Sequence, residues 1–288
     1  MKLPMTKRLL LCAELVPPCE TVADVGTDHG YLGIHLLREG KCSRVLAADL
    51  REKPLASAQA NAERYGIPIV VAAAQEIYAP RKAFPLGGRC PSAHTGADEG
   101  RIEDRAALFG MTFIQSDGLH NIEPGSFDAL VLAGMGGDLI SRILAEAPWL
   151  DGGDYTLVLQ PQSAANDLRR WLGERSWSIA RERLVRDGRF LYAVMVVRPE
   201  QGRALTPGEQ YVSPALRREG DPLYAAYLAR MRRALELTVQ GITQSADPAD
   251  QARAAYYRAA LDEITALGPA PEPSPSGEGV TSAHTGDG

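Results

Sequence analysis

The sequence predicts an α/β fold built on a mainly parallel β-sheet, and three observations support this. Short apolar runs alternate with amphipathic segments from residue 21 onwards. Glycines and acidic residues follow several of the apolar runs. A strong hairpin signal, Asp187 followed by Gly188, separates the last two runs. Alternating strands and helices imply a parallel sheet that is covered on both faces.

The elements follow one another in a regular order. We expect a leading helix over 7–15, which Pro17 and Pro18 end. Five parallel strands are expected over 21–25, 44–49, 112–116, 129–133 and 155–159. The helices between them are expected over 30–37, 54–65, 138–147 and 166–172. Two further strands, 178–185 and 190–197, close a seven-stranded sheet that resembles the Rossmann-like sheet of class I methyltransferases.

The character of the chain changes after Pro199. Apolar residues then step by four and three along one helix: Tyr224, Leu228, Met231, Leu235, Thr238 and Ile242. Asp247 and Pro248 start a second helix, so we predict a C-terminal α-helical hairpin with coiled-coil packing. The predicted domains are therefore 1–199, a cofactor-binding domain, and 206–267, the helical hairpin. Residues 268–288 are rich in Pro, Ser and Gly and are expected to form a disordered tail.

The regular alternation fails between Ile67 and Gly110, where Pro and Gly break every periodicity. A run of this length without secondary structure is unusual inside a compact domain, so we expect a disordered surface insertion over about 75–110. The string Ser-Ala-His-Thr-Gly occurs there at 92–96 and again at 282–286. The repeat is either low-complexity material, which we favour, or a motif that binds through His94 and His284.

Composition limits the classes of partner. The net charge of −5 argues against a protein that coats nucleic acid nonspecifically, because such proteins carry a net positive charge. Arginines cluster over 169–189 and 217–233, but acids are interleaved with them, so each cluster alone predicts a solvated charged face. The four cysteines form no Cys-x-x-Cys pair, so neither a metal site nor a disulfide framework is expected. No run reaches the ~20 apolar residues that span a bilayer, and we expect a cytoplasmic protein.

A glycine-containing turn after the first strand predicts a nucleotide-binding site. Residues 22–32 read VADVGTDHGYL, and Asp49 ends the next apolar run. An acid about 20 residues beyond such a turn accepts hydrogen bonds from ribose hydroxyls. NAD and S-adenosylmethionine both carry this ribose. The turn offers only Gly26 and Gly30, whereas a dinucleotide site favours G-x-G-x-x-G.

The charges of this region favour S-adenosylmethionine over NAD. Asp24, Asp28 and Asp49 would repel a pyrophosphate but tolerate a cationic sulfonium and an amino group. A tight turn with acidic caps remains the alternative explanation for any single residue. Ligands bind at the carboxyl ends of the strands in such sheets. The predicted cofactor-binding residues are Asp24, Gly26, Thr27, Asp28, Gly30, Asp49, Leu50, Asp117, Gly118, Gly134, Met135 and Gly136.

Each part of this set has an expected role. Asp24 and residues 26–30 would line the methionine part, Asp49 the ribose, and residues 117–119 the adenine edge. Residues 134–137, Gly-Met-Gly-Gly, would form a floor beside the methyl group, where small side chains admit a flat acceptor base. A tight strand-to-helix turn is the alternative for this glycine run.

Five ordered motifs together resemble the bacterial tRNA (adenine-22-N1)-methyltransferase family. They are DVGTDHGY at 24–31, ADLR at 48–51, SDGL at 116–119, AGMGG at 133–137 and LQPQS at 159–163. The resemblance covers Lys2 to Arg198 apart from the insertion, and the helical hairpin agrees with the coiled-coil C-terminal domain of that family. Gly33 departs from the proline that is more frequent in the family.

The resemblance implies S-adenosylmethionine as cofactor and tRNA as substrate. It also implies a cofactor pocket that contains Asp24, Gly26, Asp28, His29, Tyr31, Asp49, Asp117 and Met135. We expect Asp28, His29 and Tyr31 to be catalytic: the first two through hydrogen bonds to the exocyclic amine or uptake of a proton, and Tyr31 by stacking on a flipped base. His29 has a second interpretation as a turn residue with satisfied hydrogen bonds.

Two other functions are also compatible with the sequence. One is an S-adenosylmethionine-dependent methyltransferase that acts on another RNA, a small molecule or a protein, in which case the arginine clusters are ordinary surface. The other is a cofactor-sensing, RNA-binding module that retains the pocket without turnover. Transfer of a labelled methyl group to bulk tRNA distinguishes the module from the enzymes.

Overall fold

A computed structural model describes residues 2–70, 109–244 and 247–268 of the chain. The strands within these residues are β1 (Thr21–Val25), β2 (Arg44–Asp49), β3 (Gly110–Gln115), β4 (Ala129–Met135), β5 (Thr156–Pro161), β6 (Trp177–Asp187) and β7 (Phe190–Gln201). They form one sheet in the order β3-β2-β1-β4-β5-β7-β6. The pairs from β3 to β5 are parallel, and β7 is antiparallel to both β5 and β6. The predicted α/β fold is confirmed.

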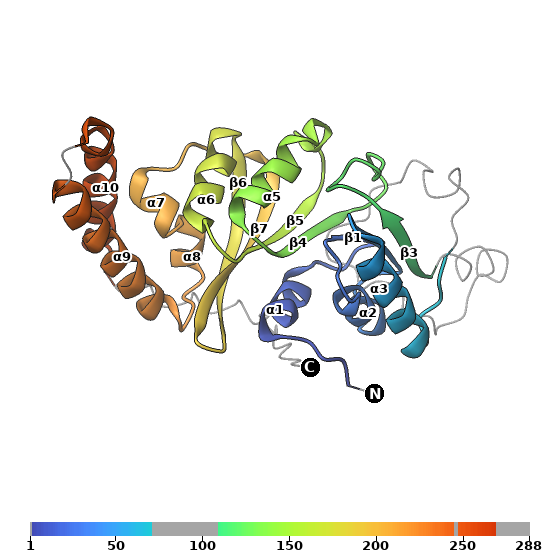
Figure 1. Ribbon diagram of the computed structural model, residues 1–288. Helices are drawn as coiled ribbons and strands as arrows, with labels where there is room; N and C mark the ends of the chain where they lie inside the picture. Colours follow the sequence, from blue (N-terminus) through green and yellow to red (C-terminus); the bar gives the residue numbers. More distant parts are fainter. Residues whose placement is uncertain (1, 71–108, 245–246, 269–288) are drawn as a thin grey trace, which may run out of the picture.

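Helices cover both faces of the sheet. They are α1 (Lys7–Leu15), α2 (Tyr31–Arg38), α3 (Glu52–Arg64), α5 (Gly137–Ala145) and α6 (Ala165–Glu174). Figure 1 shows α1, α2 and α3 on one face and α5 and α6 on the other. Successive β1 residues point to opposite faces, so Val22 packs in the core cluster of α1 and α2, and Ala23 in that of α5 and α6. Both faces are dry, which explains why the parallel strands are continuous apolar runs.

The observed bounds of the third and fourth strands differ from the predicted ones. β3 begins at Gly110 rather than at residue 112, and β4 continues to Met135 with a register shift after Ala133. Ile69 also pairs with Met111, so the chain before residue 71 already touches β3. The predicted insertion falls almost wholly outside the described residues. Cys90 and both Ser-Ala-His-Thr-Gly segments lie outside them as well.

Helices extend the C-terminal part beyond the sheet. They are α7 (Pro207–Tyr211), α8 (Pro214–Arg218), α9 (Tyr224–Gln244) and α10 (Pro248–Ala266), and a short 3-10 helix, Pro148–Leu150, precedes β5. The predicted pair is present, since α9 and α10 pack against each other, and α10 also packs on α7. The division of the chain between residues 199 and 206 stays a prediction. None of the helices within the described residues is long and apolar enough to cross a bilayer.

A buried ion pair joins the helical part to the sheet. The guanidinium of Arg169 on α6 donates to both carboxylate oxygens of Glu182 on β6, at 3.2 and 2.5 Å, and both side chains are fully buried. Arg169 also donates to the carbonyl of Gln210 at 2.9 Å and to the hydroxyl of Tyr227 on α9 at 3.0 Å. The prediction of a solvated arginine face is therefore wrong for Arg169, because its partners lie on three other segments.

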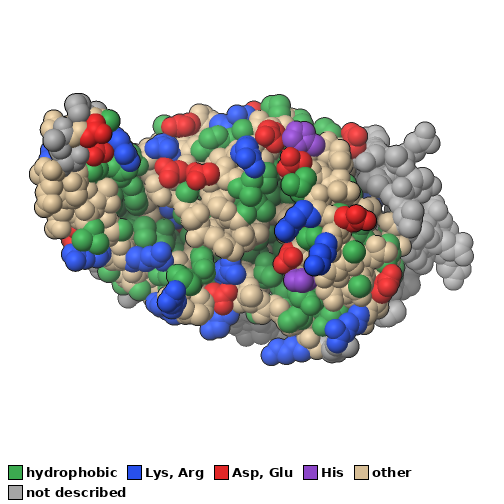
Figure 2. Space-filling model, in the orientation of Figure 1, with side chains coloured by type: hydrophobic (Ala, Val, Ile, Leu, Met, Phe, Trp, Pro, Cys, Tyr) green, Lys and Arg blue, Asp and Glu red, His purple; other side chains and the backbone are tan. Residues whose placement is uncertain are grey.

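The remaining arginines agree better with a mixed, solvated surface. Arg170 pairs with Asp167 at 2.9 Å, and Arg181 pairs with Glu219 at 2.9 Å. The face of the molecule in Figure 2 shows Lys and Arg side chains interspersed with Asp and Glu rather than merged into one basic patch. This pattern fits the negative net charge of the chain.

Candidate functional site at the carboxyl edge of the sheet

The turn after β1 folds back against the end of β2. The amides of Gly26 and Thr27 both donate to the carbonyl of Ala48, at 2.8 and 3.0 Å. Gly26 has a φ of +79°, in the left-handed region that favours glycine. A Cβ at this position would come within 2.8 Å of the Cε of Met135. The turn, β2 and the end of β4 therefore meet at one edge, as the sequence predicted.

Asp24 and Asp49 are two buried acids at this edge. Asp24 is 4% exposed and its Oδ2 accepts a hydrogen bond of 2.7 Å from the hydroxyl of Thr27. Asp49 is also buried and accepts from the amide of Arg51 at 2.9 Å. The pKa of Asp24 is raised to about 6, chiefly by burial and also by the charge of Asp49, while the Thr27 hydrogen bond acts in the opposite direction.

Little positive charge compensates these acids. Within the described part of the chain, Asp24 forms no ion pair. Among the described residues, the one ion-pair partner of Asp49 is Arg51, whose Nε lies 3.8 Å away on a side chain that is 74% exposed. Water screens such an exposed pair. The edge therefore carries buried negative charge that a cationic or hydroxyl-bearing ligand would stabilise.

The predicted catalytic residues lie together at the start of α2. His29 Nδ1 is 2.9 Å from the hydroxyl of Ser57, and its Nε2 is 3.6 Å from Oδ2 of Asp28. The His29 and Tyr31 rings lie 5.7 Å apart, and Tyr65 packs on Tyr31. Both ring nitrogens of His29 thus have neighbours, which supports its interpretation as a turn residue. The catalytic assignment of Asp28, His29 and Tyr31 stays a prediction.

The predicted adenine edge lies beside the end of β2. The amide of Ser116 donates to the carbonyl of Asp49 at 3.0 Å, which places the loop after β3 next to that acid. Asp117 is exposed, and Gly118 packs against Ile143 with a φ of +56°. Leu50 is 56% exposed. Asp49, Leu50, Asp117 and Gly118 are therefore brought together, while Leu119 belongs to the core.

The glycine floor is held by residues for which the sequence predicted no role. The amide of Gly134, at a φ of +81°, donates to Oε1 of Gln160 at 3.2 Å. Arg8 on α1 reaches the same oxygen with its Nη1 at 3.4 Å. The amide of Gly137 donates to the carbonyl of Ser163 at 2.9 Å. Gln160 stands in one of the five motifs, but no local pattern identified Arg8.

Helix α1 lies close to this edge as well. The pKa of the Cys12 thiol is raised to about 12, chiefly by burial and also by the nearby Asp24 carboxylate. Arg8, one turn earlier on the same helix, acts on that thiol in the opposite direction. Helix α1 packs against β4 and β5, and its Arg8 reaches the Gln160 oxygen that also binds the Gly134 amide. No group of three or more His, Cys, Asp or Glu among the described residues is placed to hold a metal ion.

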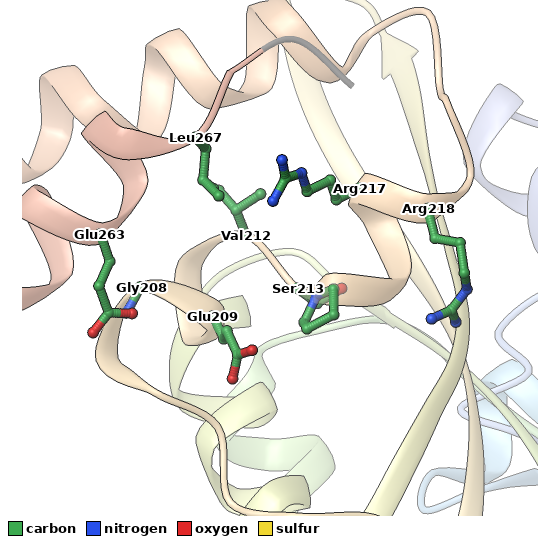
Figure 3. Close-up of a pocket in the computed structure, with 9 residues that line it drawn as sticks. Gly208, Glu209, Val212, Ser213, Arg217, Arg218, Glu263 and Leu267 are labelled. Carbon is green, nitrogen blue, oxygen red and sulfur yellow. The ribbon is translucent and has the colours of Figure 1, made fainter. Parts of the chain in front are cut away.

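A separate cavity of about 300 Å³ lies between α7, α8 and the end of α10 (Figure 3). Its acids are already engaged. Glu263 accepts from the Thr206 hydroxyl at 2.5 Å and from the Gly208 amide at 2.9 Å, and Glu209 pairs with Arg203. This cavity lies between packed helices of the C-terminal part, and none of the predicted site residues lines it.

The fold and the acidic, glycine-lined edge define a Rossmann-like methyltransferase domain. A general model of methyltransferase domains matches residues 5–76, which contain Asp24, the turn and Asp49. A second model, described as tRNA (adenine(22)-N(1))-methyltransferase, matches residues 99–265, more than half of the chain. The chain belongs to the tRNA (adenine(22)-N(1))-methyltransferase family, as its five motifs predicted.

Known proteins agree with this assignment over most of the chain. The tRNA (adenine(22)-N(1))-methyltransferase of Bacillus subtilis is 25% identical over 252 residues, 85% of this chain and 89% of that protein. A putative tRNA methyltransferase of Mycoplasma pneumoniae is 28% identical and covers 74% of this chain and 81% of its own length. The crystal structure of a putative tRNA (m1A22) methyltransferase of Streptococcus pneumoniae superposes with a TM-score of 0.64 and 25% identity, over 90% of this chain and 99% of that one.

Proposed function

We propose that this chain transfers a methyl group from S-adenosylmethionine to N1 of adenine 22 in tRNA. The observation that carries the proposal is the pair of buried, poorly compensated carboxylates, Asp24 and Asp49, beside the glycine floor. This edge stands in a chain that belongs to the tRNA (adenine(22)-N(1))-methyltransferase family. The relative from Streptococcus pneumoniae has also been crystallised with S-adenosyl-L-methionine.

The residues present fit that cofactor. Asp49 would accept hydrogen bonds from the ribose hydroxyls, and Asp24 would face the cationic methionine part. The φ of +79° at Gly26 favours a glycine, so backbone rather than a side chain would lie against the ligand. Thr27, Asp28 and Gly30 would complete the methionine side. Leu50, Asp117 and Gly118 would border the adenine, while Gly134 and Gly136 flank Met135 in the floor.

The chain mainly has to align the two reactants. When bound, S-adenosylmethionine supplies an electrophilic methyl group on a sulfonium centre. N1 of adenine already carries a lone pair, so correct positioning contributes more than removal of a proton. The adenine must first leave its stack, which costs a few kcal/mol. Tyr31, whose ring lies 5.7 Å from that of His29, would stack on the flipped base.

Two groups beside Tyr31 are proposed to act on the base itself. Asp28 and His29 project from the same turn and are both about half exposed or more. Their oxygen and nitrogen atoms would hydrogen-bond to the exocyclic amine or take up its proton after methylation. Methylation at N1 leaves a positive charge on the base, and the nearby carboxylate of Asp28 would stabilise that charge. The reaction would take place in the cytoplasm, with tRNA as the partner.

A methyl-transfer assay with mapping of the product tests the proposal. The full chain is incubated with labelled S-adenosylmethionine and a transcribed tRNA, and nucleosides are identified by mass spectrometry. We expect 1-methyladenosine at position 22 and none in a tRNA in which that adenine is replaced by guanine. Incorporation at another position, or into protein or small molecules only, would contradict the proposed substrate.

A second experiment measures binding of S-adenosylmethionine in the absence of tRNA. Asp49→Ala is expected to abolish detectable S-adenosylmethionine binding in calorimetry, because the ribose would lose its acceptor. Arg51→Ala removes only the exposed neighbour of Asp49 and serves as the control. Unchanged affinity of the Asp49 variant would show that the ribose lies elsewhere.

A further inference from the structure

The tip of the β6–β7 hairpin extends beyond the sheet at the same edge as the candidate site. Pairing between β5 and β7 ends at Leu159 and Met195, close to the carboxyl end of β5. Pairing between β6 and β7 continues to Asp187 and Phe190. The first five residues of β7 therefore have β6 as their only strand partner in the described sheet. The tip overhangs the edge where Asp24, Asp49 and the glycine floor lie.

The tip is anchored from two sides. On one side, the Nε of Arg8 donates to Asp187 at 3.0 Å, and its guanidinium lies 4.9 Å from the centre of the Tyr192 ring. On the other side, Arg230 of α9 donates to the carbonyl of Leu191 at 2.9 Å. Figure 1 shows the hairpin tip between α1 and the beginning of α9. Arg8 also reaches Gln160, so one side chain links the tip to the floor glycine Gly134.

The charges at the tip differ from those on the rest of β6. Arg181 and Arg183 on this strand pair with Glu219 and Glu14. Arg186 and Arg189 are exposed and form no ion pair with any described residue. Arg8 neutralises Asp187, the acid between them. Among the described residues, the positive charge of the tip is therefore not balanced by an acid, on a chain whose net charge is −5.

An exposed aromatic ring accompanies this charge. Phe190 is 47% exposed, and the guanidinium of Arg189 lies 4.9 Å from the centre of its ring. An arginine over an aromatic ring offers a flat surface for a nucleobase and a cation for a phosphate. A purely apolar partner would leave both cations without a counter-charge, and acidic side chains alone would leave the exposed ring without a stacking partner.

We propose that Arg186, Arg189 and Phe190 form an RNA-binding tip that holds the strand next to the methylated adenine. The assignment rests on the proposed function and deepens it, since it names the element that contacts the substrate outside the reaction site. The arginines would contact phosphates, and Phe190 would stack on an unpaired or terminally stacked base. Arg8 is a positioning residue, because its contacts with Asp187 and Gln160 hold the tip at a fixed distance from the glycine floor.

Steady-state methylation of tRNA by the full chain tests the charge part. The variant is Arg186→Gln with Arg189→Gln, and the control is Arg170→Gln with Arg181→Gln, which removes the same charge from ion-paired surface positions. We expect the KM for tRNA to rise at least tenfold in the tip variant and less than threefold in the control. The dependence of log KM on log salt should become shallower by about one to two, because phosphate contacts are lost. The affinity for S-adenosylmethionine should not change.

The aromatic part has its own variants. Phe190→Ala is expected to raise the KM for tRNA about tenfold without changing the salt dependence, and Phe190→Tyr should restore it. If the wild-type chain methylates tRNA but the tip variants have the same KM as the control, the RNA-binding role of the tip is wrong and the proposed function still stands. A wild-type chain that binds the cofactor but methylates no tRNA would overturn both this assignment and the proposed function.

Discussion

Two regions of the molecule bury charge in opposite ways. At the junction of α6, β6 and α9, Arg169 and Glu182 neutralise each other, and further hydrogen bonds come from Tyr227 and Ser213. At the carboxyl edge of the sheet, Asp24 and Asp49 are buried side chains of like charge, with a hydroxyl and an exposed arginine as neighbours. The pKa of Arg169 is raised chiefly by its partner against the effect of burial, whereas that of Asp24 is raised by burial itself.

We infer that the buried charges of the Arg169–Glu182 junction stabilise the fold, whereas those of Asp24 and Asp49 serve to bind a ligand. A paired site is complete in the free protein, so removing one partner leaves an uncompensated charge. A site with excess negative charge is completed only when a ligand brings hydroxyl groups or a cation. Variants of the first region should change stability, and variants of the second should change binding.

The largest expected effect is on the paired region. Glu182→Ala should lower the free energy of unfolding by about 3–5 kcal/mol, because Arg169 remains buried without its partner. Chemical denaturation monitored by circular dichroism measures this change. The control is Glu219→Ala, which breaks a pair with Arg181 whose side chains are 19% and 52% exposed and should cost less than about 1 kcal/mol. Equal losses in the two variants would show that burial of the pair does not matter.

A smaller effect is expected when charge is removed from the second region. Asp24→Asn should weaken S-adenosylmethionine binding by about 2–3 kcal/mol, since a charge-assisted contact is lost. The unfolding temperature of the cofactor-free protein at pH 8 should stay the same or rise, because a buried charge has been removed. A variant that is clearly less stable without cofactor would contradict the contrast between the two regions.

The pH dependence should follow Asp24 as well. Its pKa of about 6 means that protonation begins in the folded chain as the pH falls through 6. Affinity for S-adenosylmethionine should then decrease by up to about tenfold, or ~1.4 kcal/mol, per pH unit below that value. The raised pKa also means that the folded state binds this proton more tightly than the unfolded state. The corresponding stability is present below the ordinary carboxyl pKa and is lost as the pH rises through about 6.

Calorimetric titrations between pH 5 and 8 measure this linkage. The Asp24→Asn protein is the control, and its affinity should vary much less over the same range. An identical profile in wild type and variant would assign the titration to another group.

The smallest expected effect concerns a single hydrogen bond of the paired region. Tyr227→Phe removes the hydroxyl that accepts from Arg169 and should lower the free energy of unfolding by about 1 kcal/mol. Arg169 keeps Glu182 and the Gln210 carbonyl, which explains the modest size. Differential scanning calorimetry detects such a change. A loss as large as that of Glu182→Ala would mean that the hydroxyl, not the ion pair, holds the junction.

Much of the fold could be predicted because its signals are local. The apolar runs at 21–25 and 44–49 coincide with β1 and β2, since buried parallel strands have few polar residues. The proline after Asp247 marks the start of α10. Helices α7 and α8 were not predicted, because five residues are too few to show a helical period.

The site divides in the same way. The turn from Asp24 to Gly30 and the acid at the end of β2 are visible as a spacing in the sequence. The role of Arg8 is not, because its hydrogen bond to Gln160 spans 152 residues and depends on the order of the strands. The burial of Arg169 likewise follows from packing against α9, which no charge pattern on α6 reveals. Local chemistry is readable in sequence, and partners brought together by topology are not.

The chain leaves and re-enters the sheet at almost the same point around β3. The amide of Val70 donates to the carbonyl of Met111 at 2.8 Å, and the hydroxyl of Thr112 donates to the carbonyl of Val70 at 3.2 Å. Ends that are already joined make the length between them nearly irrelevant, since doubling a loop costs only about 0.6 kcal/mol. We therefore expect that the connection between Val70 and β3 can differ in length without moving β3 or the neighbouring Asp49.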